Sequence, residues 1–492
     1  MKIKGKCASM IMAMLITLMI PKMVFAAESD RNDDFLHTDG SKIYDLYGNE
    51  VRLTGIAWFG NETPNNSYHG LWANTLDGIL DKVANNGFNI LRVPLSVQLV
   101  NEWRNGRNPM PDSMNDYVNP DLKNKSALEI LDKSIAICKK KGIKVMFDMH
   151  RVTNVSQSQT WYTDKYSVED YEESWKWLTN HYKNDDTVIA MDIFNEPNGK
   201  AYRQEQCAKW DDSKDIDNWK YEAEKVSKEI LDINPNLLIM VEGVETYPKE
   251  RYDYNTKDAS NYYGTWWGGN LRGVQDHPIN IENHPNQVVY SPHDYGPGVS
   301  SQSWFESGFT KESLLAKAWE PNWLYIQEKN IAPLLIGEWG GKMDGADNQK
   351  WMQALADTIK EKNINHTFWC LNPNSGDTGG ILENDFSTVD TAKMALVKPT
   401  LWQNKSGQGI GLDHKVNLGS KGTHVVATSQ EEPVIIKGDV NNNGEVDILD
   451  YILLQKYILD SSIEININNS YITDDKKINS ADLLGLRKIL LE

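Results

Sequence analysis

Two glutamates stand at the ends of apolar runs in this 492-residue chain. The stretch "VIAMDIFNEPNG", residues 188–199, reads as a buried strand that stops at Asn195, Glu196 and Pro197. The stretch "APLLIGEWGG", residues 332–341, carries Glu338 in the corresponding place. Two carboxyl groups in different surroundings can divide acid–base work, because one stays protonated while the other stays ionised. Such a pair suits cleavage of a glycosidic bond, whose leaving oxygen needs a proton while the anomeric carbon is attacked.

The surroundings of the two glutamates suggest which one holds the proton. We expect Glu196 to be the protonated carboxyl and, because it precedes a proline, to be extended at the end of its strand. Glu338 is expected to stay ionised, helped by the charge of Arg92 and the hydroxyl of Tyr295. The structural alternatives are that Glu196 caps the following helix and that Glu338 pairs with Arg92 only for stability.

Polar side chains end the other apolar runs as well. They are Arg92 in "RVP", His150 in "DMHR", His293 and Tyr295 in "PHDY", and Trp369 in "FWCLN". The histidines are alternatively metal ligands, but neither lies in an H-x-H or H-E-x-x-H pattern. We therefore expect no metal or other cofactor for catalysis.

Eight apolar runs between Val51 and about Trp402 alternate with stretches of helical period, such as "ALEILDKSIAICKKKG" and "QKWMQALADTIKEKN". Strands that alternate with helices imply a parallel sheet. Eight such repeats in about 350 residues predict the α/β class and a (β/α)₈ barrel, whose strand ends share one bowl. The segment "FLHTDGSKIYDLYGNE" before them predicts a hairpin with turns at Asp39-Gly40 and Gly48-Asn49, which closes the bottom of the barrel.

The motifs, taken in order, resemble glycoside hydrolase family 5. "IFNEPNG" and "LIGEWGG" combine with "RVP", "DMHR", "PHDY" and "FWCLNPNSGDTGG", while "HGLW", "NPNLLIMVEGVE" and "TWWGGNLRGV" are similar to the bacterial endo-β-1,4-glucanase branch. The resemblance covers roughly residues 35–403 and implies a retaining endoglucanase. It puts Glu196 in the position of the acid/base and Glu338 in that of the nucleophile. The supporting positions that it implies are Arg92, His150, Asn195, His293, Tyr295 and Trp369, with Asn195 contacting the sugar 2-hydroxyl.

Three tryptophans are candidates for substrate binding: Trp72 in "HGLW", Trp267 in "TWWGGN" and Trp369 at the last strand. Flat rings suit the apolar faces of sugars, whereas Trp266 is as readily explained by packing beneath its neighbour. The predicted substrate is cellulose or a related β-glucan. Rival interpretations are another β-glycanase (mannanase, xylanase or xyloglucanase) and a non-catalytic carbohydrate-binding protein with the same barrel.

The first 26 residues predict an export signal. A basic start with three lysines precedes the apolar run "MIMAMLITLMI" and the small-residue cleavage pattern Val24-Phe25-Ala26. A membrane anchor is the alternative, but the run is short for a span. Loss of residues 1–26 removes four lysines and no acids, which changes the formal net charge from −18 to −22. So acidic a chain argues against nucleic-acid and membrane partners. We expect a secreted, extracellular protein.

Cysteines are few after the predicted signal. Cys138, Cys207 and Cys370 remain, without metal-ligand spacing, so at most one disulfide forms and three thiols are favoured. The predicted boundaries are 1–26 for the signal, 27–403 for the barrel, 404–437 for a linker with a short strand at "THVVA", and 438–492 for a separate small all-α module.

The C-terminal module contains "DVNNNGEVDILD", residues 439–450, with the spacing of an EF-hand calcium loop. Its candidate ligands are Asp439, Asn441, Asn443, the Glu445 carbonyl, Asp447 and Asp450, and Gly444 occupies the sharp turn. A second repeat, "YITDDKKINSADLLGLRKIL", retains Asp482 but has Tyr471 and Lys476 where an acid and a glycine are expected. We expect one calcium site and a second site that binds calcium weakly or not at all.

Paired loop-and-helix repeats after a linker resemble a type I dockerin. The resemblance implies docking to a cohesin domain of a scaffold protein and hence a place in a cellulosome. Ile448, Leu449 and Lys456 match its recognition positions, as do Ser480 and Ala481 in the second repeat. The alternative is ordinary helix packing. A calcium sensor explains this module alone, but neither the export signal nor the barrel.

Overall fold

The computed structural model describes residues 34–203, 206–306, 308–426, 436–441, 443–461, 463, 465–473 and 477–491. The predicted export signal, residues 1–26, lies outside these ranges. In the described ranges, none of the helices combines the length and the apolar character needed to cross a membrane.

Eight parallel strands form the central sheet, and they confirm the predicted (β/α)₈ barrel. Neighbouring strands pair in the order β11-β8-β7-β6-β5-β4-β13-β12, and parallel bridges from Tyr290 to Leu334 and from His293 to Glu338 close the circle between β11 and β12. The strands are β4 (Thr54–Ala57), β5 (Ile90–Ser96), β6 (Lys144–Arg151), β7 (Val188–Asp192), β8 (Leu238–Val241), β11 (Val288–Tyr290), β12 (Leu335–Ile336) and β13 (Asn365–Phe368).

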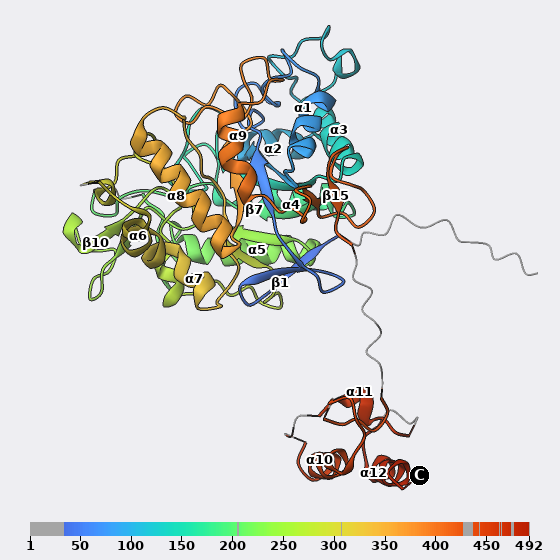
Figure 1. The fold of residues 1–492 in the computed structure, drawn as a ribbon. Coiled ribbons are helices and arrows are strands. Elements are labelled where there is room, and N and C mark those ends of the chain that lie inside the picture. Colours follow the sequence, from blue (N-terminus) through green and yellow to red (C-terminus); the bar gives the residue numbers. More distant parts are fainter. Residues whose placement is uncertain are drawn as a thin grey trace, which may run out of the picture.

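Helices lie on the outside of these strands, as Figure 1 shows for α1, α3, α8 and α9. The predicted helices at "ALEILDKSIAICKKKG" and "QKWMQALADTIKEKN" are α3 and α8, and Ser126 and Glu129 start α3 with a capping box. The helices of the barrel are α1 (Leu76–Asn85), α2 (Val97–Arg104), α3 (Ala127–Lys140), α4 (Val168–Tyr182), α5 (Trp219–Ile233), α6 (Lys311–Leu314), α7 (Tyr325–Glu328), α8 (Ala346–Lys362) and α9 (Thr391–Val397).

Between β8 and β11 the chain forms an antiparallel pair, β9 (Thr246–Pro248) and β10 (Tyr262–Gly264). The short 3₁₀ helices η2 (Ala259–Asn261) and η3 (Arg272–Gln275) flank β10. This segment between β8 and β11 adds to the rim of the barrel beyond the simple alternation of strand and helix. After β11, the helical segment η5 (Leu315–Leu324) joins α6 to α7.

The base of the barrel carries the predicted hairpin, formed by β1 (Leu36–Asp39), β2 (Lys42–Asp45) and β3 (Glu50–Val51). Gly40 and Gly48 occupy its two turns with φ of 52° and 80°, a region that favours glycine. Cys138, Cys207 and Cys370 are buried free thiols.

The structure differs from the predicted linker of residues 404–437, because residues 404–426 pack on the barrel. They form the short strands β14 (Ile410–Gly411) and β15 (Thr423–His424), the latter inside the predicted "THVVA". Leu412, Leu418 and Val425 are buried in the same core as the barrel. Among so many Gly and Ser residues, these isolated apolar side chains make no periodic pattern, which is why the sequence suggested a linker.

The C-terminal module contains α10 (Ile448–Leu459), α11 (Ile467–Ser470) and α12 (Ser480–Ile489). Its small core includes the buried side chains of Val440, Leu454 and Leu486. Ile448 and Leu449 are 60% and 57% exposed, so they do not serve the packing of this core.

Candidate active site

Arg92 lies at the centre of a buried polar cluster inside the barrel. Its guanidinium donates from Nη1 to Glu338 Oε1 at 2.6 Å, from Nε to Asp192 Oδ2 at 2.9 Å and from Nη2 to Asn195 Oδ1 at 2.8 Å. Asp148 and Glu242 approach the same guanidinium at 3.1 and 3.4 Å. Burial would lower the pKa of Arg92, but these carboxylates raise it well above its usual value. Arg92 therefore stays charged and joins side chains from several strands.

His293 joins the two glutamates that the sequence singled out. Its Nδ1 lies 3.1 Å from Glu196 Oε1 and 3.6 Å from Glu338 Oε2. One ligand atom from each of these three side chains lies within 4.8 Å of the others, so the carboxyl groups face each other closely. The Tyr295 hydroxyl donates to Glu338 Oε2 at 2.7 Å.

The two carboxyl groups have opposite pKa shifts. Burial raises the pKa of Glu196 and outweighs the opposing effect of its hydrogen bond to His293. Burial acts the same way on Glu338, but the charges of His293 and Arg92 hold its pKa below the usual value. Glu196 is thus suited to hold a proton and Glu338 to stay ionised.

The backbone at Glu196 differs from the extended conformation that we predicted from Pro197. Strand β7 ends at Asp192, and Glu196 has a φ of 54°, in the left-handed region. Its N–H donates to Glu242 Oε2 at 2.8 Å, and Asn198 Nδ2 donates to its carbonyl at 2.9 Å. These contacts impose a conformation that the local preference before proline does not supply.

A layer of stacked rings borders the glutamates. His150 stacks on Trp369, with ring centroids 5.2 Å apart, and Trp369 stacks in turn on Phe59. Asp148 Oδ2 lies 2.7 Å from His150 Nδ1 and fixes the orientation of the imidazole. Burial raises the pKa of Asp148 to about 7.

The other two candidate tryptophans lie in different settings. Trp267 is 43% exposed, whereas Trp72 is half-buried between His69 and Phe386. Trp266 is buried and packs on Trp304 at 4.9 Å, the packing alternative that the sequence left open.

The structure thus brings the predicted catalytic side chains into one cluster. They are Glu196, Glu338, Arg92, His150, Asn195, His293 and Tyr295. Strand β5 continues to Ser96, so Arg92 points from inside a strand and not from its end.

Three buried acids of the cluster were not among our candidates: Asp148, Asp192 and Glu242. Asp148 and Glu242 each follow an apolar run directly, the same signal that selected Glu196 and Glu338, whereas Asp192 lies inside the run that ends at Phe194. Glu242 follows "LLIMV" and also meets His293 Nε2 at 3.1 Å. The positions after apolar runs could therefore have indicated Asp148 and Glu242, but not Asp192.

Two overlapping groups of the described residues have the donor set for a metal ion: Glu196, His293 and Glu338, and Asp192, Glu242 and His293. Arg92 already pairs with Asp192, Glu242 and Glu338. This buried cation and His293 supply positive charge where a metal ion would otherwise do so.

The first loop of the C-terminal module is closed by its own acids. Asp439 accepts hydrogen bonds from the N–H groups of Asn443 and Gly444, and Asp450 accepts them from Asn441 and Asp447. Oxygen atoms dominate this loop, as a calcium site requires.

In the second repeat, Asp482 is the counterpart of Asp450. Its Oδ1 accepts from the N–H groups of Ile472 and Thr473 and from the Thr473 hydroxyl, and its Oδ2 accepts from Asn479 N–H. Among the described residues, the Asp482 carboxylate therefore accepts more hydrogen bonds from the protein itself than the Asp450 carboxylate does.

Comparison with known proteins agrees with this architecture. Residues 44–375 match the cellulase family, glycosyl hydrolase family 5, and residues 437–491 match the dockerin type I domain. Endoglucanase G of Acetivibrio thermocellus is 46% identical to this chain, in an alignment that covers 88% of this chain and 86% of the endoglucanase. An endoglucanase of Paenibacillus polymyxa is 41% identical, covering 74% and 86% respectively. A solved endocellulase from Pyrococcus horikoshii has a TM-score of 0.67 at 32% identity, covering 74% of this chain and 98% of its own.

The barrel and its facing carboxyl groups define a glycoside hydrolase. The chain belongs to the cellulases of glycosyl hydrolase family 5 and carries a type I dockerin.

Proposed function

We propose that this protein is a secreted, retaining endo-β-1,4-glucanase that cleaves internal bonds of cellulose. The observation that carries the proposal is the closeness of Glu196 and Glu338, whose facing oxygens lie within 4.8 Å. Retaining glycosidases hold their two carboxyl groups about 5–5.5 Å apart, whereas inverting enzymes leave about 6.5–9.5 Å for a water molecule. The opposite pKa shifts of the pair support the same assignment.

The first step forms a covalent glycosyl-enzyme. A carboxylate oxygen of Glu338 bonds to the anomeric carbon while the bond from that carbon to the glycosidic oxygen breaks. Glu196 gives its proton to the departing oxygen, so the cleaved chain leaves as an alcohol. Arg92 and Tyr295 hold the attacking carboxylate in place through their hydrogen bonds at 2.6 and 2.7 Å.

The second step reverses the roles. Glu196, now ionised, takes a proton from water, and the water oxygen bonds to the anomeric carbon as the bond to Glu338 breaks. Two inversions at one carbon retain the β configuration. Both glutamates return to their starting protonation states.

Neighbouring side chains are proposed to orient the sugar. Because Asn195 Oδ1 accepts from Arg92, its amide nitrogen is the group left to donate to the 2-hydroxyl of the sugar. Trp369, held between His150 and Phe59, is the proposed platform beneath the sugar next to the scissile bond. Trp72 and Trp267 are proposed to line the cleft on either side.

The dockerin is proposed to bind calcium and a cohesin domain. Asp439, Asn441, Asn443, the Glu445 carbonyl, Asp447 and Asp450 would hold one ion, and calcium would supply the positive charge that these oxygens share. Ile448 and Leu449, exposed at the start of α10, and Lys456 on the same helix would contact the cohesin. A scaffold bearing that cohesin would place the enzyme in a cellulosome outside the cell.

Product stereochemistry tests the catalytic proposal. Proton NMR of a cello-oligosaccharide digest should show the β anomer first, with the α anomer appearing only by later mutarotation. An α anomer formed first would overturn the retaining mechanism. Digests of carboxymethylcellulose, glucomannan and xyloglucan, run side by side, test the preference for glucan over the rival β-glycans. Sequencing of the secreted protein should find Ala27 at its start.

A further inference from the structure

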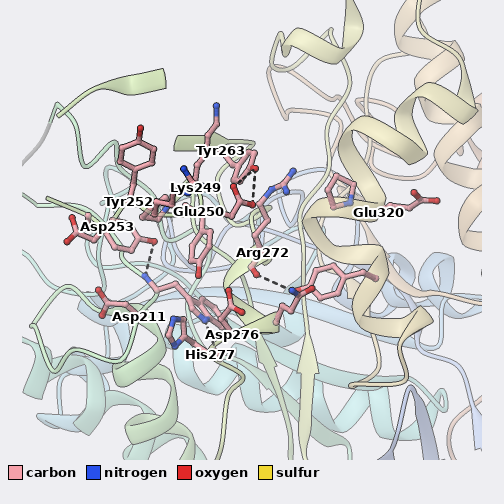
Figure 2. A pocket seen from close by; sticks show the side chains of 18 of the residues that line it. Asp211, Lys249, Glu250, Tyr252, Asp253, Tyr263, Arg272, Asp276, His277 and Glu320 are labelled. Carbon is pink, nitrogen blue, oxygen red and sulfur yellow. Dashed lines mark hydrogen bonds between the residues drawn. The ribbon is translucent and has the colours of Figure 1, made fainter. Parts of the chain in front are cut away.

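A large cavity lies outside the catalytic cluster, beneath the antiparallel pair β9–β10. It has a volume of about 710 Å³, within the range of small-ligand sites. Trp210, η3 and the helical segment from Ala316 to Lys329 form its other walls. Figure 2 shows this cavity, which we call the hairpin pocket. The predicted catalytic residues are not among those that line it.

Aromatic rings make up much of the wall. Five tyrosines and Trp210 line the hairpin pocket. Tyr252 is 50% exposed, and its ring makes no aromatic or cation contact with the described part of the chain. The half-buried Tyr247 has a hydroxyl without a hydrogen-bond partner among the described residues. Rings of this kind offer apolar faces together with polar edges.

Arg272 is the most unusual side chain of the hairpin pocket. Its guanidinium lies over the Tyr263 ring, 4.0 Å from the centroid, and its Nε donates to Asn322 Oδ1 at 2.8 Å. In the described ranges, no carboxylate pairs with Arg272, and its two Nη atoms make no hydrogen bond. Figure 2 shows Arg272 beside Tyr263, with Glu320 on the facing helical wall. Four N–H donors of a half-buried guanidinium therefore remain for a ligand.

The charges of the wall indicate what kind of ligand fits. Five acidic and four basic side chains line the hairpin pocket, so the two signs nearly balance. A polyanion would be repelled by the acids, and a cation by the lysines and arginines. A neutral ligand rich in hydroxyl groups satisfies both kinds, because hydroxyls donate to carboxylates and accept from the guanidinium. Together with the rings, this is the chemistry of a carbohydrate.

We propose that the hairpin pocket is a second binding site for a β-linked glucan chain. The choice of glucan rests on the proposed function, since the chain that the active site cuts is the carbohydrate at hand. Binding there holds the polymer on the flank of the barrel while another stretch of it occupies the catalytic cleft. The site serves attachment to long or insoluble substrate and takes no part in the chemistry.

Binding stoichiometry tests the proposal in the full-length chain. Calorimetric titration of the inactive Glu338→Ala variant with cellohexaose should give two sites per chain. Addition of Arg272→Ala should leave one site. Addition of Tyr252→Ala, at an exposed position that should not disturb folding, should weaken the second site about 3- to 10-fold through loss of ring contact. Tyr117→Ala, which changes a tyrosine that is 98% exposed elsewhere, is the matched control and should leave both sites intact.

Activity supplies an independent readout with Glu338 intact. Tyr252→Ala should leave turnover of a soluble aryl cellobioside unchanged and lower the release of sugar from insoluble cellulose. A single cellohexaose site in the Glu338→Ala chain, or a second site indifferent to both Arg272→Ala and Tyr252→Ala, would overturn the inference. If the enzyme still hydrolyses cello-oligosaccharides in that case, the proposed function stands. Failure to cleave any β-glucan would instead refute the proposed function.

Discussion

The carboxylate of Glu242 accepts a hydrogen bond from the backbone N–H of Glu196 at 2.8 Å. Through its other oxygen the same carboxylate meets His293 Nε2 at 3.1 Å, while His293 Nδ1 faces Glu196 and Glu338. One buried acid thus contacts both the backbone of the proposed acid/base and the imidazole that neighbours the two proposed catalytic carboxyl groups. We infer that Glu242 is a positioning residue.

Glu242→Gln should lower kcat/KM roughly 10- to 100-fold, because the amide keeps an acceptor for Glu196 N–H but loses the charge. Burial raises the pKa of Glu242 well above its usual value. In its ionised form Glu242 raises the pKa of His293 against the effect of burial, and charged His293 lowers the pKa of both Glu338 and Glu196. Without that charge the pKa values of Glu338 and Glu196 rise. Both limbs of the pH profile of kcat/KM should therefore move to higher pH.

The matched control for this variant is Glu245→Gln. Glu245 accepts from Gly199 N–H at 3.0 Å in a neighbouring loop and pairs with Lys200, away from His293. It should leave both limbs of the profile in place. An unshifted profile for Glu242→Gln would assign Glu242 a merely structural role.

Azide should distinguish the two glutamates. Glu338→Ala should lose at least about 10⁴-fold in kcat, and azide should enter the space left and yield a glycosyl azide of inverted configuration. Glu196→Ala, assayed on an aryl cellobioside whose leaving group needs no proton, should yield the azide of retained configuration. The same configuration from both variants would contradict the assigned roles.

The sequence predicted the barrel because strands buried on both faces are continuously apolar, and the polar residues that end such runs are conspicuous. That logic located Glu196, Glu338 and His293. It did not yield the left-handed backbone of Glu196, which depends on Glu242, 46 residues further along the chain. Tertiary contacts set that geometry, and no local pattern encodes it.

Calcium titration of the full chain should give one tight site. In the first loop Asn441, Asn443 and Asp447 add side-chain oxygens to those of Asp439 and Asp450. In the second repeat Thr473 already donates twice to Asp482 Oδ1, and Tyr471 replaces the first acid. Asp439→Ala should abolish the tight site, and Asp482→Asn should leave it unchanged. Two equivalent sites by calorimetry would refute this account of the second repeat.

Cohesin binding should depend on the exposed start of α10. Leu449→Arg should weaken binding about tenfold or more, because a buried charge replaces an apolar anchor at the interface. Leu459→Arg, at the other end of the same helix and 81% exposed, is the control. Surface plasmon resonance against immobilised cohesin measures both variants. Equal loss in the two would remove Leu449 from the recognition surface.

The segment 404–426 should stabilise the barrel through His414. Its Nδ1 lies 2.6 Å from Asp34 and its Nε2 lies 2.9 Å from Asp45, and Asp34 also pairs with Lys144. Burial opposes the charge, but both aspartates raise the pKa of His414 above its usual value. A raised pKa in the folded state means that the stabilisation is full below about pH 6.5 and is lost as the pH rises through the folded pKa.

His414→Ala should therefore lower stability by about 1–3 kcal/mol at pH 5 and by less at pH 9. Thermal unfolding of the chain ending at residue 426, scanned at one rate at both pH values, measures the difference. His181→Ala removes a partner of Asp132 on a surface where the imidazole is 31% exposed, and it should cost little at either pH. A larger loss for His414→Ala at pH 9 than at pH 5 would contradict a charged His414 between these aspartates. The same chain shortened to residue 403 should unfold at a lower temperature at both pH values, because Leu412 and Leu418 leave the core as well.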